Sequence, residues 1–180
     1  MARQIPVKMA EMAVCRPDDR AVLVALGLGS CIGLCLYDPV AKVAGMAHVV
    51  LPDSSSARRQ EPPGKYADTA VSALILQMSS AGAVRTRMIA AVAGGAHVFS
   101  FGNGSGPGGA MDIGARNAEA VLHQLRALRI PVAATDVGGS TGRTVQLFPE
   151  DGLVTVRLTG SPETELVRLS SQRPASRRAA

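Results

Sequence analysis

Cys31 and His48 are the two residues whose types and spacing indicate chemistry. Cys31 follows the run Gly27-Leu28-Gly29-Ser30, and residues 21–37 carry no charged side chain, so this segment is expected to be buried. A free thiol has a pKa of about 8.5 and is mostly protonated at neutral pH. A neighbouring imidazole can take that proton, and the resulting thiolate of a thiolate–imidazolium pair can attack a carbonyl carbon.

A hairpin is expected to bring the two side chains together. Asp38-Pro39-Val40-Ala41 is typical of a turn, and residues 43–51 read as the returning strand. If residues 38–41 form a four-residue loop, Cys31 lies directly opposite His48 on one face, with Cβ atoms roughly 5 Å apart. A slip of one residue would place them on opposite faces. The alternative is that Cys31 is a small buried hydrophobe and His48 a satisfied strand histidine.

Gly29 and Ser30, directly before the cysteine, are candidates for substrate approach or for stabilising an oxyanion. Glycine lets a backbone come close to a substrate, and peptide N–H groups can bind a developing negative charge. The three cysteines lack the spacing of a zinc site, so neither a metal nor another cofactor is expected. A formal G-x-G-x-x-G run beginning at Gly104 has no strand directly before it and is rejected as a dinucleotide site.

The remaining pattern predicts the elements that must position these residues. Apolar periodicity indicates helices over residues 66–80 and 113–128, and strands over 7–14, 88–92, 132–136, 144–148 and 154–158. Two short apolar strands are expected to meet at the glycine turn of residues 26–29. The fold class is therefore α/β in one domain, with a largely antiparallel β core. Residues 1–165 are expected to form this domain, residues 166–180 a basic, disordered tail, and residues 94–114 a glycine-rich loop.

Composition limits the partners and the compartment. The net charge of +5 comes mostly from arginines near the end of the chain, and aromatic residues make up only 3% of it, so nucleic-acid binding is not expected. An odd number of cysteines without a secretory signal favours a reducing, cytoplasmic location. No segment reads as a membrane-inserting helix.

Several motifs, in order along the chain, resemble the chemoreceptor glutamine deamidases, the CheD family. They span about residues 10–160: 27–31 (GLGSC), 36–39 (LYDP), 46–52 (MAHVVLP), 65–70 (KYADTA), 94–96 (GGA), 113–117 (IGARN) and 136–139 (DVGG). The resemblance implies an α/β/α layered fold around a β-sandwich. It also implies that Cys31 is the nucleophile and His48 its base, in hydrolysis of a receptor glutamine amide to glutamate. The implied partners are methyl-accepting chemotaxis receptors and a CheC-type phosphatase.

One family position departs from the pattern. The family has a threonine six residues before the cysteine that assists the histidine, and here that position is Ala25. A methyl group cannot hold an imidazole tautomer, so the third catalytic member is absent or supplied from elsewhere. This departure keeps two alternatives open: a weakly active or non-catalytic chemotaxis adaptor that binds receptors or a CheC-type phosphatase, and another cysteine hydrolase.

Overall fold

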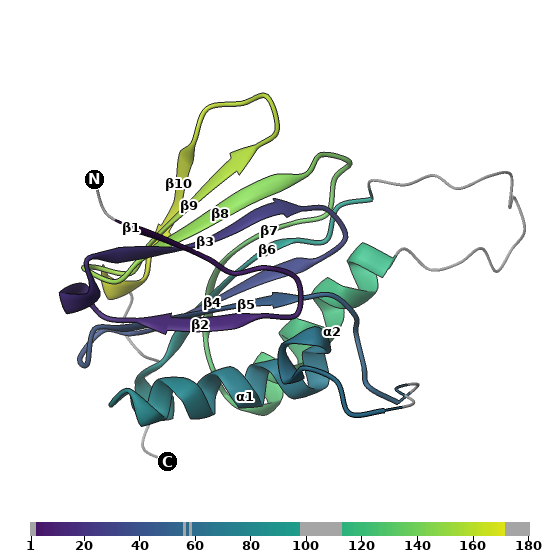
Figure 1. Cartoon of the computed structure of the whole chain (residues 1–180). Helices are drawn as coiled ribbons and strands as arrows, with labels where there is room; N and C mark the ends of the chain where they lie inside the picture. Colours follow the sequence, from purple (N-terminus) through teal and green to yellow (C-terminus); the bar gives the residue numbers. More distant parts are fainter. Residues whose placement is uncertain (1–2, 56, 58, 98–112, 172–180) are drawn as a thin grey trace, which may run out of the picture.

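Two five-stranded sheets and a helical layer make up the described part of this computed structural model, which covers residues 3–55, 57, 59–97 and 113–171 (Figure 1). Sheet A has the order β1 (Arg3–Pro6), β3 (Ala21–Leu28), β8 (Arg143–Phe148), β9 (Leu153–Leu158), β10 (Thr164–Arg168). Sheet B has the order β2 (Met12–Cys15), β5 (Val43–Val49), β4 (Ile32–Asp38), β6 (Ile89–Gly94), β7 (Val132–Val137). The helices are α1 (Ala67–Ser80) and α2 (Ile113–Ala127), with short 3-10 turns at Pro17–Asp19, Pro63–Lys65, Arg85–Arg87 and Leu169–Ser171.

Strand β4 is buried on both faces, which explains the long uncharged run in the sequence. Leu34 and Leu36 point toward the helices and pack in a core with Leu74 of α1. Cys35 and Tyr37, on the other face, pack in the core between the two sheets. Because successive side chains of a strand point to opposite faces, a strand between two cores is uncharged along most of its length, and the charged residue of β4, Asp38, is its last.

The predicted fold class is confirmed as mixed α/β with two largely antiparallel sheets in a single domain. Among the described residues both α-helices lie against sheet B, on the side away from β9 and β10 (Figure 1). The layers of this part of the chain therefore run helices, sheet B, sheet A, which differs from the implied α/β/α order. The two expected helices and the strands after residue 88 are found close to their expected bounds.

The expected strand over residues 7–14 is found only in its last three residues. Strand β1 ends at Pro6 and β2 begins at Met12, and the two strands belong to different sheets. Between them the chain turns through Ala10, whose φ of 66° is incompatible with an extended strand. The loose apolar alternation of this segment did not reveal that turn.

The connection between β3 and β4 differs from the glycine turn expected at residues 26–29, because β3 runs to Leu28 and the two strands belong to different sheets. Strand β3 continues through Gly27 to Leu28, and the connection to β4 is residues 29–31. Cys31 therefore lies at the edge where the chain passes from sheet A to sheet B.

The ordered domain extends past the expected boundary at residue 165. Strand β10 pairs with β9 up to Arg168, and Leu169 is fully buried in the core between the sheets. Residues 172–180 of the expected tail and residues 98–112 of the glycine-rich segment lie outside the described residues.

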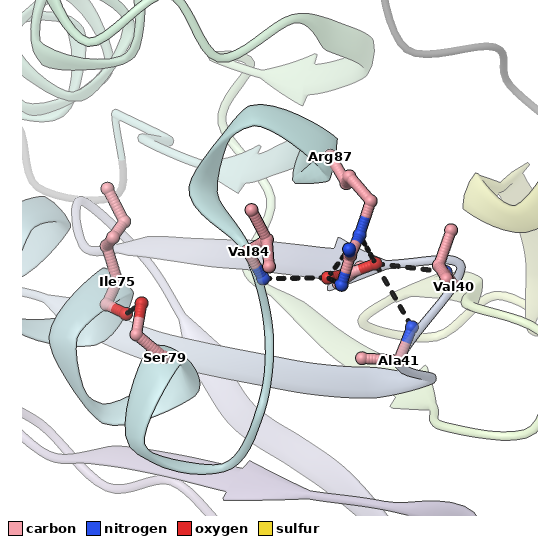
Figure 2. A network of polar contacts seen from close by, with 7 residues as sticks. Val40, Ala41, Ile75, Ser79, Val84 and Arg87 are labelled. Atoms are coloured by element: carbon pink, nitrogen blue, oxygen red, sulfur yellow. Dashed lines mark hydrogen bonds and ion pairs between the residues drawn. The ribbon is translucent and has the colours of Figure 1, made fainter.

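Asp38 fixes the turn between β4 and β5. Its buried carboxylate accepts hydrogen bonds from the backbone N–H groups of Val40 and Ala41 in the turn, and from Val84 N–H beyond α1. The Arg87 guanidinium adds bidentate contacts at 2.7–3.0 Å, and Figure 2 shows these bonds converging. The hairpin is thereby tied to the connection between α1 and β6.

Candidate active site

The pairing of β4 with β5 begins at Ile32, opposite Val49; extended by one residue, this hairpin register places Cys31 diagonally across from His48 and not directly opposite. Asp38 pairs with Val43 and Gly33 with His48, so the loop comprises residues 39–42. The predicted pairing is thus wrong by two residues, because Asp38 stays in the strand while its carboxylate organises the turn. A shift of two keeps the face unchanged, and diagonal neighbours on one face have Cβ atoms within about 7–8 Å.

Neighbouring side chains confirm that the two residues share a face. Ala44 and Met46, which alternate with His48 along β5, face the core between the sheets. Cys35 faces the same core from β4, and Cys31 packs against its margin. The thiol is partly exposed, whereas His48 is only 4% exposed.

The tautomer of His48 is determined by a backbone carbonyl. His48 Nδ1 lies 3.0 Å from Val7 O, and because a carbonyl oxygen only accepts, Nδ1 must carry the proton. In the neutral ring Nε2 then holds the free lone pair. That atom is buried and has no hydrogen-bond partner in the described part of the chain. Nε2 is therefore the ring atom that is free to take a proton, and the Cys31 thiol makes no hydrogen bond to it in this structure.

The segment before β2 holds the histidine by its backbone as well. His48 N–H donates to Glu11 O and Ala10 N–H donates to His48 O, each at 3.0 Å. Val7 N–H in turn donates to Val24 O of β3 at 2.8 Å. The imidazole is therefore anchored to sheet A through the two peptide groups of Val7.

Burial favours the neutral forms of both Cys31 and His48. It lowers the pKa of His48 from 6.5, against smaller opposing effects of the Val7 carbonyl and the Glu11 charge. Burial also raises the pKa of the Cys31 thiol. The structure therefore does not support the thiolate–imidazolium pair expected at rest, because both charged forms are poorly solvated here. The pKa values of the Cys15 and Cys35 thiols are each raised to about 12, chiefly by burial.

The loop that carries Cys31 is fixed through its carbonyl groups. Gly29 O accepts from Ala96 N–H and Cys31 O from Gly95 N–H, both at 2.8 Å. Gly94, with φ +120°, brings its backbone so close that a Cβ there would lie 2.2 Å from Cys31 O. Only glycine fits this position, which accounts for the motif at residues 94–96.

Ala25 lies in β3 opposite Val145 and is fully buried in the core between the sheets. After it, a bulge accommodates Leu26 and Gly27, and Gly27 has φ +64°. The bulge leaves Leu26 58% exposed beside the cysteine loop. Bulges next to active sites commonly re-aim the strand that follows.

Two contributors were not found from the sequence. The Val7 carbonyl is a backbone group, and the pattern of side chains in a sequence does not predict the partners of backbone groups. Asn117 of α2 is fully buried, and its Nδ2 donates to Ser30 O and to Val50 O at 2.9 Å each. A signal for Asn117 was present: it lies one turn before Val121, so a polar residue occupies the helix's apolar face.

Metal ligands and membrane spans were also searched for. Among the described residues no three His, Cys, Asp or Glu side chains gather as a metal site. No helix in that part of the chain has the length and apolarity to cross a membrane.

Comparison with known proteins identifies the family. The family model described as "CheD chemotactic sensory transduction" matches residues 50–158, a stretch that begins just after His48. The "Probable chemoreceptor glutamine deamidase CheD" of Symbiobacterium thermophilum is 52% identical over 162 residues, 89% of this chain and 95% of that protein. The "Chemoreceptor glutamine deamidase CheD" of Halalkalibacterium halodurans is 45% identical over 163 residues, covering 90% and 98%.

A third similar protein, from Lachnoclostridium phytofermentans and named "Probable chemoreceptor glutamine deamidase CheD", is 40% identical over 166 residues, covering 92% of this chain and all of that protein. Matches of this extent must include the segment from Cys31 to His48, which the family model leaves out. With more than half of the chain matched by the family model, and with relatives well above 30% identity along nearly their whole lengths, this chain belongs to the CheD family.

Proposed function

We propose that this chain is a chemoreceptor glutamine deamidase, which hydrolyses glutamine side-chain amides of a receptor to glutamate and releases ammonia. The observation that carries the proposal is the buried, unpartnered Nε2 of His48 on the same sheet face as the Cys31 thiol. The names of the similar proteins support the substrate class.

The reaction begins with proton transfer and attack. His48 Nε2 takes the thiol proton of Cys31 as the sulfur bonds to the amide carbon of the glutamine. The carbonyl oxygen becomes an oxyanion. The candidate donors to it are the backbone N–H groups of Ser30 and Cys31, in the peptide bonds that follow Gly29 and Ser30. No resting ion pair is needed, because the base accepts the proton during the attack.

Breakdown of the intermediate uses the same proton. The imidazolium returns it to the amide nitrogen, the C–N bond breaks, and ammonia leaves a thioester on Cys31. Water, deprotonated by Nε2, then attacks the thioester carbon. The C–S bond breaks, glutamate is released and the thiol regains its proton.

Val7 O orients the His48 ring, which is the role that the family threonine would have at the position of Ala25. Its hydrogen bond to Nδ1–H holds the ring so that Nε2 is the basic atom. The carbonyl also stabilises the imidazolium as it forms, because Nδ1–H remains its donor in both states. The alanine therefore does not leave the histidine without an orienting group.

The substrate would be the cytoplasmic helical bundle of a methyl-accepting chemotaxis receptor. Conversion of glutamine to glutamate there adds a negative charge and shifts the signalling equilibrium of the bundle, which is an adaptation step. The enzyme would accordingly act in the cytoplasm. Leu26, more than half exposed beside the cysteine loop, offers an apolar contact to an approaching helix.

A second function, that of an adaptor binding receptors or a CheC-type phosphatase, is favoured by Ala25 alone. It predicts that binding survives Cys31→Ala and that no glutamine is changed. A peptidase or another cysteine hydrolase would instead cleave the receptor chain or a different acyl group. Ammonia release separates deamidation from both of these.

The test is incubation with a purified receptor cytoplasmic domain, followed by peptide mass spectrometry. Deamidation predicts a gain of about one mass unit at specific glutamines, as NH is replaced by O, and its absence with Cys31→Ala. An unchanged receptor that still binds the protein would support the adaptor. Equal deamidation by Cys31→Ala would overturn the assignment of the nucleophile.

A further inference from the structure

Asn117 links the two segments that carry the site. One Nδ2 proton is donated to Ser30 O, directly before the nucleophile, and the other to Val50 O, two residues after His48. In the hairpin register Val50 is the position opposite Cys31, where β4 and β5 cease to pair. The side-chain amide of Asn117 thus joins the chain before β4 to the chain after β5, at the point where the backbone hydrogen bonds between the two strands end.

The bond to Ser30 O also orients the next peptide N–H. In a trans peptide the C=O and N–H groups point in opposite directions, and the chain has no cis peptide bond in its described part. Because Ser30 O points to α2, the Cys31 N–H points away from it. Among the backbone hydrogen bonds found outside the helices and strands of the described residues, none is donated by the Cys31 N–H, so we take it as a donor for substrate.

Asn117 is held too firmly for an incidental contact. It is fully buried on the face of α2 that packs on the sheet, next to Ala118 and one turn before Val121. Its Oδ1 is also buried and has no partner in the described part of the chain, which is a cost that a purely apolar residue would avoid. The unsatisfied Oδ1 of Asn117 is accounted for if the two hydrogen bonds that its Nδ2 donates are needed for function.

We propose that Asn117 is a positioning residue for the proposed deamidation: it clamps the Cys31 loop to the histidine strand and directs the Cys31 N–H at the oxyanion. The inference rests on the proposed function, since it assigns how the same site is assembled. Asn117 itself contacts neither the thiol nor the imidazole through any hydrogen bond of the structure. Its effect is on their relative placement.

The primary test does not need a receptor. Iodoacetamide labelling of Cys31 is followed by mass spectrometry in a double-mutant cycle of His48→Ala and Asn117→Ala. In the wild-type background His48→Ala is expected to slow labelling by about tenfold or more, as loss of a general base does. In the Asn117→Ala background the same change is expected to slow it by no more than about twofold.

Two control variants separate positioning from stability. Arg87→Ala breaks a clamp at the far end of β4, about 20 Å from Ile32 at 3.3 Å per residue, and should lower the melting temperature without changing the His48 dependence of labelling. Asn117→Gln keeps both donors on a longer arm and should recover part of the coupling. If the alanine variant does not fold, Asn117→Leu, which has a similar shape and no hydrogen-bond donor, replaces it in the cycle.

The receptor assay supplies the second measurement. Asn117→Ala should lower kcat by about tenfold to hundredfold, as small misplacements of reacting groups do, with KM within about twofold. If the His48 dependence of labelling is the same with and without Asn117, the proposal is overturned. If instead wild-type labelling does not depend on His48, it is the proposed catalytic pair that fails, and the two failures are thereby distinguished.

Discussion

At the scale of single residues, the site depends on desolvation more than on charge pairing. Both Cys31 and His48 lie at a margin of the core where their ionised forms are poorly solvated. Partial exposure distinguishes Cys31 from the other two thiols, and the proposed function adds His48 as its base. Cys15 and Cys35 are buried, and their pKa values are raised to about 12.

Thiol labelling should show this difference. Near neutral pH, Cys31 should react with iodoacetamide faster than Cys15 and Cys35, and His48→Ala should slow only Cys31. Mass spectrometry of the three cysteine peptides measures the rates. Equal rates at all three positions would mean that no base serves Cys31.

The acid limit of activity should lie below pH 6.5. Because the pKa of folded His48 is lowered from 6.5, Nε2 stays unprotonated below that pH, and the rate falls only as the pH drops through the lowered value. The same shift makes the free energy of unfolding depend on pH. Below pH 6.5 the unfolded state takes up a proton that folded His48 does not yet bind, so the free energy of unfolding decreases as the pH falls. A pH profile of kcat/KM measures this limit, and an acid limb above pH 7 would contradict the assigned cause.

Ala25→Thr should do little for catalysis. Nδ1 already donates to Val7 O, so an added hydroxyl has no unsatisfied donor to orient, while its extra atoms enter a packed core. The rate should change by less than about threefold, the effect of well under one hydrogen bond, and stability should fall by about 1–3 kcal/mol. Kinetics and thermal unfolding of the same preparation measure both. A rise of tenfold would show that the family hydroxyl is limiting.

At the scale of elements, the sequence predicted the hairpin but not its register. Strands, turn and the common face of Cys31 and His48 follow from apolar runs and turn residues. The position of the loop does not, because Asp38 accepts bonds from Val84 and Arg87, more than 40 residues away. The turn between Pro6 and Met12 escaped prediction for a similar reason, since its contacts are to strands elsewhere in the chain.

The glycine at position 94 gives a prediction for the loop. Gly94→Ala should lower stability by about 1–2 kcal/mol for its positive φ and by a further 1–3 kcal/mol for the contact with Cys31 O. It should also displace the cysteine loop and lower activity. The matched control is Gly82→Ala, which has φ +97° but open space around it and should cost only the backbone component. Equal unfolding free energies for the two variants would rule out the close approach.

At the scale of the whole molecule, sheet B is enclosed between sheet A and the helices, and the candidate active site includes the connection from β3 to β4. Composition predicted one domain and an α/β class. It did not predict that β10 and Leu169 complete the core, because the serine- and arginine-rich residues that follow dominate the local pattern. Burial of Leu169 is a tertiary property of the closed sandwich.

The Asp38–Arg87 clamp should contribute to stability at neutral pH. Burial alone would raise the pKa of Asp38, but bonds from Arg87 and from the backbone outweigh it and lower that pKa below 3.8. The contribution is thus present above the unfolded pKa and is lost as the pH falls through the folded one. Arg87→Ala should lower the free energy of unfolding at pH 7, because it leaves the buried Asp38 carboxylate without its charged partner, and this loss should shrink below pH 4. Denaturant unfolding at both pH values measures it, and a pH-independent cost would contradict the ion pair.

The most direct test of the whole account is deamidation of a receptor cytoplasmic domain in water enriched in oxygen-18. Hydrolysis through a Cys31 thioester predicts a gain of about three mass units at the modified glutamine, since the new oxygen comes from solvent, together with one ammonia per glutamate formed. The gain should be absent with Cys31→Ala and strongly reduced with His48→Ala. Modification that persists with Cys31→Ala, or ammonia formed without labelled glutamate, would contradict the account.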